Sequence, residues 1–146
     1  MVNSNDVRAP AAEPDSRPII SRVFGVAMLA EAITFGVASY LHLDGRIQLG
    51  FTTISGEQFR GAAIPEAIIG AVLAVGAALV LAGSGRARAI ALGTTGFAIL
   101  GVLFGLHAIL GGTKPAGAAD LTYHSVILAA LLVTFIMLLR QRARSR

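Results

Sequence analysis

The sequence predicts an all-α, polytopic membrane protein: a bundle of four transmembrane helices that run up, down, up and down, with both termini in the cytoplasm. Apolar residues make up 55% of the 146-residue chain and charged residues only 14%, and the mean hydropathy is +0.73. A soluble domain needs a more polar exterior than this composition supplies. The apolar residues fall into four runs, each near the ~20 residues that a helix needs to cross a ~30 Å hydrocarbon core: 19–43, 62–82, 89–110 and 121–139.

The basic residues predict the orientation of these spans. Nine of the twelve lie near the start of the first run, in the connection 83–88, or at the end of the chain. The positive-inside rule places these segments in the cytoplasm. One lysine against eleven arginines, with much Ala and Gly, is typical of bacteria with GC-rich genomes. We therefore expect a multi-pass protein of the bacterial inner membrane, and the net charge of +4 requires no nucleic-acid partner.

The segments outside the spans have distinct characters. Residues 1–18 are polar, contain three prolines and carry mixed charges, which predicts a disordered cytoplasmic arm. The run that follows is too long for the apolar core of a signal peptide. In the external connection 44–61, Ile47, Leu49 and Phe51 alternate with Gln48 and Gly50, as in a short strand or a segment lying at the membrane interface.

The remaining connections are short. The connection 83–88 makes the second and third spans antiparallel neighbours, and 111–120 ends in Asp120, which is placed to cap the fourth span. Residues 141–146 form a basic cytoplasmic tail. The chain has no cysteine, which excludes disulfides, thiolate metal sites and cysteine nucleophiles.

Small residues recur at helical spacing in the second and third spans. The second span carries a stripe at four-residue steps, and the third contains Gly101 and Gly105. In lipid, helices associate through close backbone approach, so these stripes predict packing seams. The seams serve either the bundle itself or contact with a second copy or another membrane protein. The stripe of the second span consists of Ala62, Glu66, Gly70, Ala74 and Ala78.

Glu31 lies about halfway along the first run. At that depth an ionisable side chain costs on the order of 2.5–3.5 kcal/mol or more, so it must face other helices, stay protonated or find a partner. Glu31 and His42 are close to three helical turns apart and so share one face. One interpretation is that the pair handles protons or cations. The alternative is a protonated Glu31 that is hydrogen-bonded to a threonine, the candidates being Thr34, Thr94, Thr95 and Thr134.

The sequence around Glu31 resembles one transporter family. Residues 27–36 read AMLAEAITFG and are similar to the first helix of small multidrug-resistance transporters, in which a membrane-embedded glutamate exchanges protons for cationic drugs. The resemblance does not carry the family's activity over to this chain. It covers ten residues, and the family's aromatic pocket has no evident counterpart in a chain that lacks tryptophan. The resemblance therefore only frames a transporter hypothesis.

All three histidines are predicted to reach the same membrane face. His42 ends the first run, His107 lies near the end of the third and His124 near the start of the fourth. With Glu66, they supply the imidazole and carboxylate ligands that suit Zn, Cu, Fe or Ni. Two of the histidines would also suit a haem iron. The alternatives are interfacial histidines within an aromatic belt of tyrosines, and a Glu66 that only follows Pro65 at the start of a helix.

Three functions follow as hypotheses. The first is an accessory or assembly partner in the membrane with a polar His/Glu site at its outer face. The second is a small proton-coupled transporter that uses Glu31 and His42. The third is a redox subunit or enzyme that binds a transition metal or haem through His42, Glu66, His107 and His124. No phosphate-binding loop, nucleophile elbow or HExxH motif is present.

Overall fold

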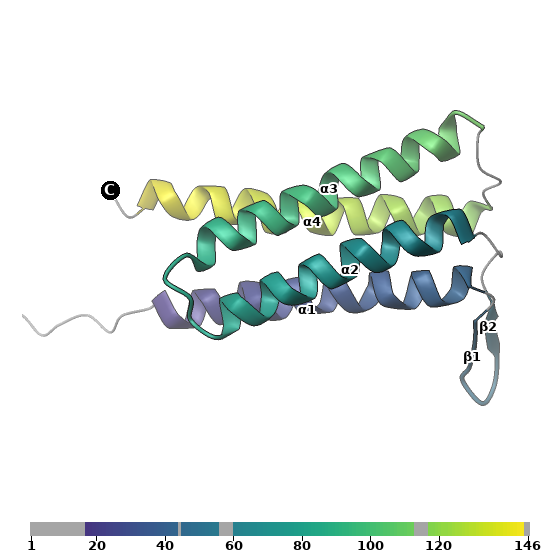
Figure 1. Cartoon of the computed structure of the whole chain (residues 1–146), viewed down its shortest axis with the longest axis horizontal. Helices are drawn as coiled ribbons and strands as arrows, with labels where there is room; N and C mark the ends of the chain where they lie inside the picture. The colour runs from purple at the N-terminus through teal and green to yellow at the C-terminus, as the bar shows by residue number, and fades with distance from the viewer. Residues whose placement is uncertain (1–16, 44, 56–59, 113–116, 145–146) are drawn as a thin grey trace, which may run out of the picture.

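The computed structural model describes residues 17–43, 45–55, 60–112 and 117–144. These residues form four long helices and one small hairpin between the first two helices (Figure 1). The hairpin strands pair antiparallel. The elements in chain order are α1 (Arg17–His42), β1 (Arg46–Gln48), β2 (Thr53–Ser55), α2 (Arg60–Leu81), α3 (Ala87–Leu110) and α4 (Ala118–Arg144).

All four helices are long and apolar enough to cross a membrane, so the prediction of four membrane-spanning helices is confirmed by length and composition. Successive helices run in opposite directions, and the start of α1 and the end of α4 lie at the same end of the bundle (Figure 1). The chain is thus a candidate multi-pass membrane protein. The cytoplasmic location of the termini stays a prediction, and most of the predicted arm 1–18 lies outside the described residues.

One predicted helix start is wrong, and so is the alternative interpretation that places Pro65 at the start of a helix. Helix α2 begins at Arg60, so Pro65 lies inside the helix and Glu66 is not in its first turn. Pro65 cannot donate a hydrogen bond to the carbonyl of Gly61, four residues earlier. The loss is tolerated because Gly61 is exposed. Helix α4 begins at Ala118, so Asp120 is a first-turn residue and not the cap. Helix α4 also continues to Arg144, through the first part of the predicted tail.

The predicted small-residue seams pack helices of this chain against one another. A methyl group added at Gly70 would lie 3.2 Å from the backbone oxygen of Ala32, which shows how closely α2 approaches α1. Gly101 of α3 meets Ile69 of α2 in the same way. Both seams are thus used within the bundle, and no protein partner is indicated by the described residues. Between the seams, the core is filled by fully buried side chains, the largest being Phe35, Met28, Leu73, Leu131 and Val102.

The two ends of the bundle are built differently. At the end that carries the termini, Arg88 Nε donates a 3.0 Å hydrogen bond to the carbonyl of Leu138 and so ties the start of α3 to α4. At the other end the hairpin extends sideways from α1 (Figure 1). Its turn contains Gly50 with φ +81° and is closed by a 2.8 Å bond from Leu49 N to Thr52 O. The alternation expected around Ile47 therefore does correspond to a short strand.

Candidate functional site

Four polar side chains meet at the end of the bundle away from the termini. His42 is the last residue of α1, Glu66 lies in the second turn of α2, and Asp120 and His124 lie in the first two turns of α4. Antiparallel helices bring the end of α1 and the starts of α2 and α4 to one level. We call these four residues the His–carboxylate ring.

The ring is closed because each member contacts two others. His42 Nε2 lies 3.6 Å from Glu66 Oε1 and 3.8 Å from Asp120 Oδ1. His124 Nε2 lies 3.8 Å from the same Glu66 oxygen, and His124 Nδ1 lies 3.1 Å from Asp120 Oδ1. The four side chains are at most 12% exposed. Imidazoles and carboxylates thus alternate around a site that is largely closed to solvent.

The hydrogen-bond geometry assigns one proton of His124. Its Nδ1 lies 2.9 Å from the backbone oxygen of Asp120 and 3.1 Å from the side-chain oxygen of the same residue. Both neighbours are acceptors when the carboxylate is ionised, so Nδ1 carries the hydrogen. His124 Nε2 then faces Glu66 either with a second proton or with a lone pair. The protonation of His124 therefore decides whether these two groups attract or repel.

Glu66 is the least satisfied member of the ring. Both of its carboxylate oxygens are buried, and neither has a hydrogen-bond partner among the described residues. The imidazole nitrogens at 3.6 and 3.8 Å are too distant for hydrogen bonds. A buried carboxylate without hydrogen bonds is costly unless a cation or a proton compensates it. The carboxylate of Glu66 is therefore the group in this site that would bind a proton or a cation.

A small pocket between α2 and α3 leads to Glu66 and His124. Its volume is about 90 Å³, and its other lining residues are mostly apolar or small, among them Pro65 and Phe104. A methyl group added at Gly105 would lie 3.1 Å from His124 Nε2, so the absence of a side chain there leaves room for the imidazole. The pocket thus reaches the ring between α2 and α3, and α3 itself contributes no residue to the ring.

Aromatic rings close the site toward the interior of the bundle. Tyr123 packs edge-on against His124 with ring centroids 5.1 Å apart, and against Phe35 at 6.3 Å. Phe35 is 1% exposed. It lies between Glu31 and His42 in sequence and one turn from Glu31, on the same face of α1. Phe35 therefore separates the two residues that the sequence grouped into one path.

Glu31 belongs to a second polar layer, deeper in the bundle. Thr134 of α4 donates a buried 2.8 Å hydrogen bond from Oγ1 to Glu31 Oε1, so one of the threonines considered as partners does bind it. The other oxygen, Oε2, is buried without a hydrogen bond to any described residue. This geometry fits the structural interpretation of Glu31 and also leaves one oxygen available to a proton.

The structure brings together three of the four residues predicted to bind a metal. His107 is exposed on α3 and takes no part in the ring. Over the part of the chain that the structure describes, no group of three or more His, Cys, Asp or Glu side chains has the geometry of a metal site. Metal binding is therefore not supported.

Two sequence signals bear on these differences. His107 follows Gly105 by two residues, which places it about 200° around the helix from a glycine that faces the bundle. Asp120 and His124 are four residues apart, the spacing at which helical side chains meet, but this is visible only if the helix begins before Asp120.

Comparisons with known proteins assign no relative to this fold or site. No protein-family model, curated protein or solved structure matches the chain.

Proposed function

We propose that the protein is a small proton-coupled membrane transporter, which binds protons and a small monovalent cation alternately at the His–carboxylate ring. One observation carries the proposal: Glu66 is buried between two imidazole nitrogens, and its oxygens have no hydrogen bond among the described residues. Ionisable groups buried within membrane helices commonly mark ion pathways and proton relays.

The charge of the ring supports exchange. With both imidazoles neutral, the two carboxylates give the four side chains two negative charges, and each proton that binds removes one. A bound cation and a proton therefore compete for the same electrostatic stabilisation, which couples their binding reciprocally. Tyr123, whose ring packs edge-on against His124, is a further titratable group beside the site.

Glu31 supplies a second carboxyl group at a deeper level. A transported proton would pass from the ring to the free oxygen of Glu31, and the fully buried Phe35 would have to move for this step. The proposal thus gives Glu31 and His42 the roles expected of a transporter and adds Glu66, Asp120 and His124.

Proton movement across the membrane of vesicles tests the proposal. The purified chain is reconstituted into liposomes that contain a pH-sensitive dye, and Na⁺, K⁺ or ethylammonium is added outside, one at a time. We expect cation-dependent proton efflux, and a loss of about tenfold or more in Glu66→Gln, equivalent to about 1.4 kcal/mol in the barrier. Gln keeps the shape of the side chain but cannot carry the negative charge.

One buried and one exposed histidine, His124 and His107, provide a matched pair of variants. His124→Gln should reduce the flux strongly, whereas His107→Gln, an exposed histidine at the same end, should leave it unchanged. Equal rates in Glu66→Gln and the unmodified chain would remove the basis of the proposal. Protein that moves no protons with any of the three cations would favour the accessory or assembly role, and stoichiometric metal found by elemental analysis would favour the metal hypothesis.

A further inference from the structure

The hairpin has two chemically different faces. Ile47 pairs with Ile54, so these two side chains lie on one face of the hairpin. The neighbouring pairs, Arg46 with Ser55 and Gln48 with Thr53, place their polar side chains on the opposite face. Two isolated strands have no core of their own to cover the apolar face.

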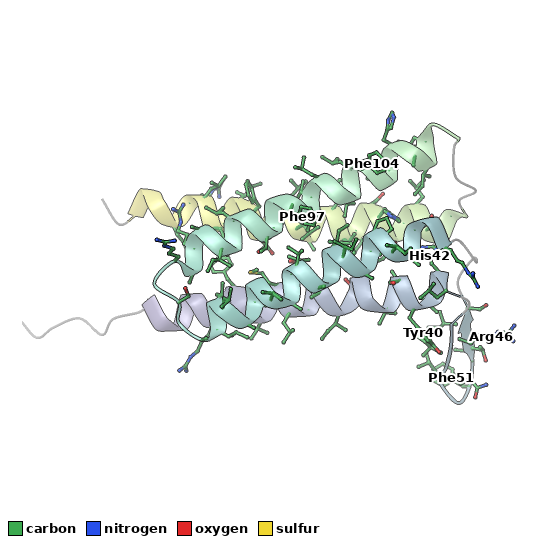
Figure 2. All side chains as sticks on the ribbon, in the orientation of Figure 1. Tyr40, His42, Arg46, Phe51, Phe97 and Phe104 are labelled. Atoms are coloured by element: carbon green, nitrogen blue, oxygen red, sulfur yellow. The ribbon has the colours of Figure 1, made fainter. Side chains whose placement is uncertain are left out.

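The hairpin is oriented across the end of the bundle. It extends sideways from α1, beyond the outline of the bundle (Figure 1). Arg46 points away from the helices, beyond the end of the bundle (Figure 2). Because side chains alternate along a strand, the face with Ile47 and Ile54 is turned back toward the side on which the helices lie. For helices that cross a membrane, this is the side of the lipid.

The tip of the hairpin is strongly apolar. Phe51 is 89% exposed and lies at the far end of the hairpin from the bundle (Figure 2). Leu49 beside it is 46% exposed. Tyr40 and Leu43, at the end of α1 from which the hairpin leaves, are also exposed. In water this surface would be unfavourable, whereas aromatic residues are favoured where a bilayer meets water.

We propose that the hairpin is a membrane anchor that lies in the lipid–water interface beside α1, with Ile47 and Ile54 against lipid and Phe51 inserted among the acyl chains. Arg46 and Gln48 then face the headgroups and water. The anchor would fix the depth of the end of α1, which carries His42. The occupant of the apolar face is the bilayer that surrounds the protein.

The absence of tryptophan makes this measurable in the whole chain. Phe51→Trp provides a single fluorescent reporter at the tip, and Gln48→Trp a matched reporter on the polar face. Each variant is reconstituted into phosphatidylcholine vesicles, with and without brominated acyl chains, and also exposed to aqueous iodide. We expect bromolipid quenching of Phe51→Trp to exceed that of Gln48→Trp about twofold or more. Iodide should quench the two in the opposite order.

Ile54→Trp is a second reporter on the apolar face and should behave like Phe51→Trp. Far-ultraviolet circular dichroism verifies that each variant keeps its helices. Iodide quenching of Phe51→Trp and Ile54→Trp as strong as that of Gln48→Trp would overturn the proposal, because it would place the whole hairpin in water. Proton flux is not used in this experiment, so the result is independent of the transport proposal.

Discussion

The hydrogen bond between Thr134 and Glu31 should contribute measurably to stability. Thr134→Val keeps the shape of the side chain and removes the donor at 2.8 Å from Glu31 Oε1. Interhelical hydrogen bonds in membranes are worth about 0.6 kcal/mol on average and up to about 1.7. Glu31 Oε2 has no hydrogen bond to a described residue. Without the Thr134 hydroxyl, neither oxygen of the buried carboxyl group has a hydrogen bond to a described side chain. We therefore expect a loss near the upper value, about 1.5 kcal/mol.

The assay is equilibrium unfolding in mixed micelles of increasing dodecyl sulfate content, followed by helicity. Thr122→Val is the matched control, because Thr122 Oγ1 bonds to the carbonyl of Ala118 in its own helix and is exposed. A double-mutant cycle with Glu31→Met isolates the pairwise energy, since removing both polar partners of a buried bond is less costly than removing one. A coupling energy below about 0.3 kcal/mol would refute the interpretation that this bond joins α1 to α4.

Two further predictions compare neighbouring or equivalent positions. Gly105→Ala places a methyl group 3.1 Å from His124 Nε2 and should impair proton flux by displacing the imidazole. Gly93→Ala in the same helix is the control, because its methyl group would meet no atom within 4 Å. This second change should stabilise the protein slightly, by up to about 1 kcal/mol. Leu131→Ala should cost at least about 1 kcal/mol more than Leu132→Ala in the same unfolding assay, because the first side chain is fully buried and the second is 40% exposed.

The sequence predicts the helices well because hydropathy and length suffice for them. Four apolar runs give four membrane-length helices, and the short connection after α2 makes α2 and α3 antiparallel neighbours. The same reasoning brings the end of α1 to the start of α4 and thus predicts that His42 and His124 share one end of the bundle. Both residues belong to the ring.

The rotation of each helix about its axis is harder to predict. In a soluble protein the polar face of a helix marks its exposed side, but a helix surrounded by lipid is apolar on all sides. Helix α3 is apolar on all sides, so its sequence does not show which face His107 occupies. The sequence groups His107 with His42 and His124, although the structure leaves His107 exposed. The orientation of α3 is set by glycine contacts with α2 and α4, which hydropathy does not record.

The positions of the helix boundaries account for the remaining differences between the predicted and the observed site. The interpretation that Pro65 begins a helix makes Glu66 an ordinary first-turn carboxylate, although α2 begins at Arg60 and has already completed a turn. Placing Asp120 before α4 hid its pairing with His124. Each error was small along the chain, yet each changed the chemistry assigned to a buried carboxylate.

The ring also bears on how the protein is made. Its members come from α1, α2 and α4, and the last helix contributes two of the four side chains. If the helices enter a bilayer in chain order, His42 and Glu66 arrive before Asp120 and His124. Until α4 is in place, the buried carboxyl group of Glu66 has only one of its two imidazole neighbours. A chain truncated before α4 should therefore be recognised by membrane quality-control proteases as incomplete.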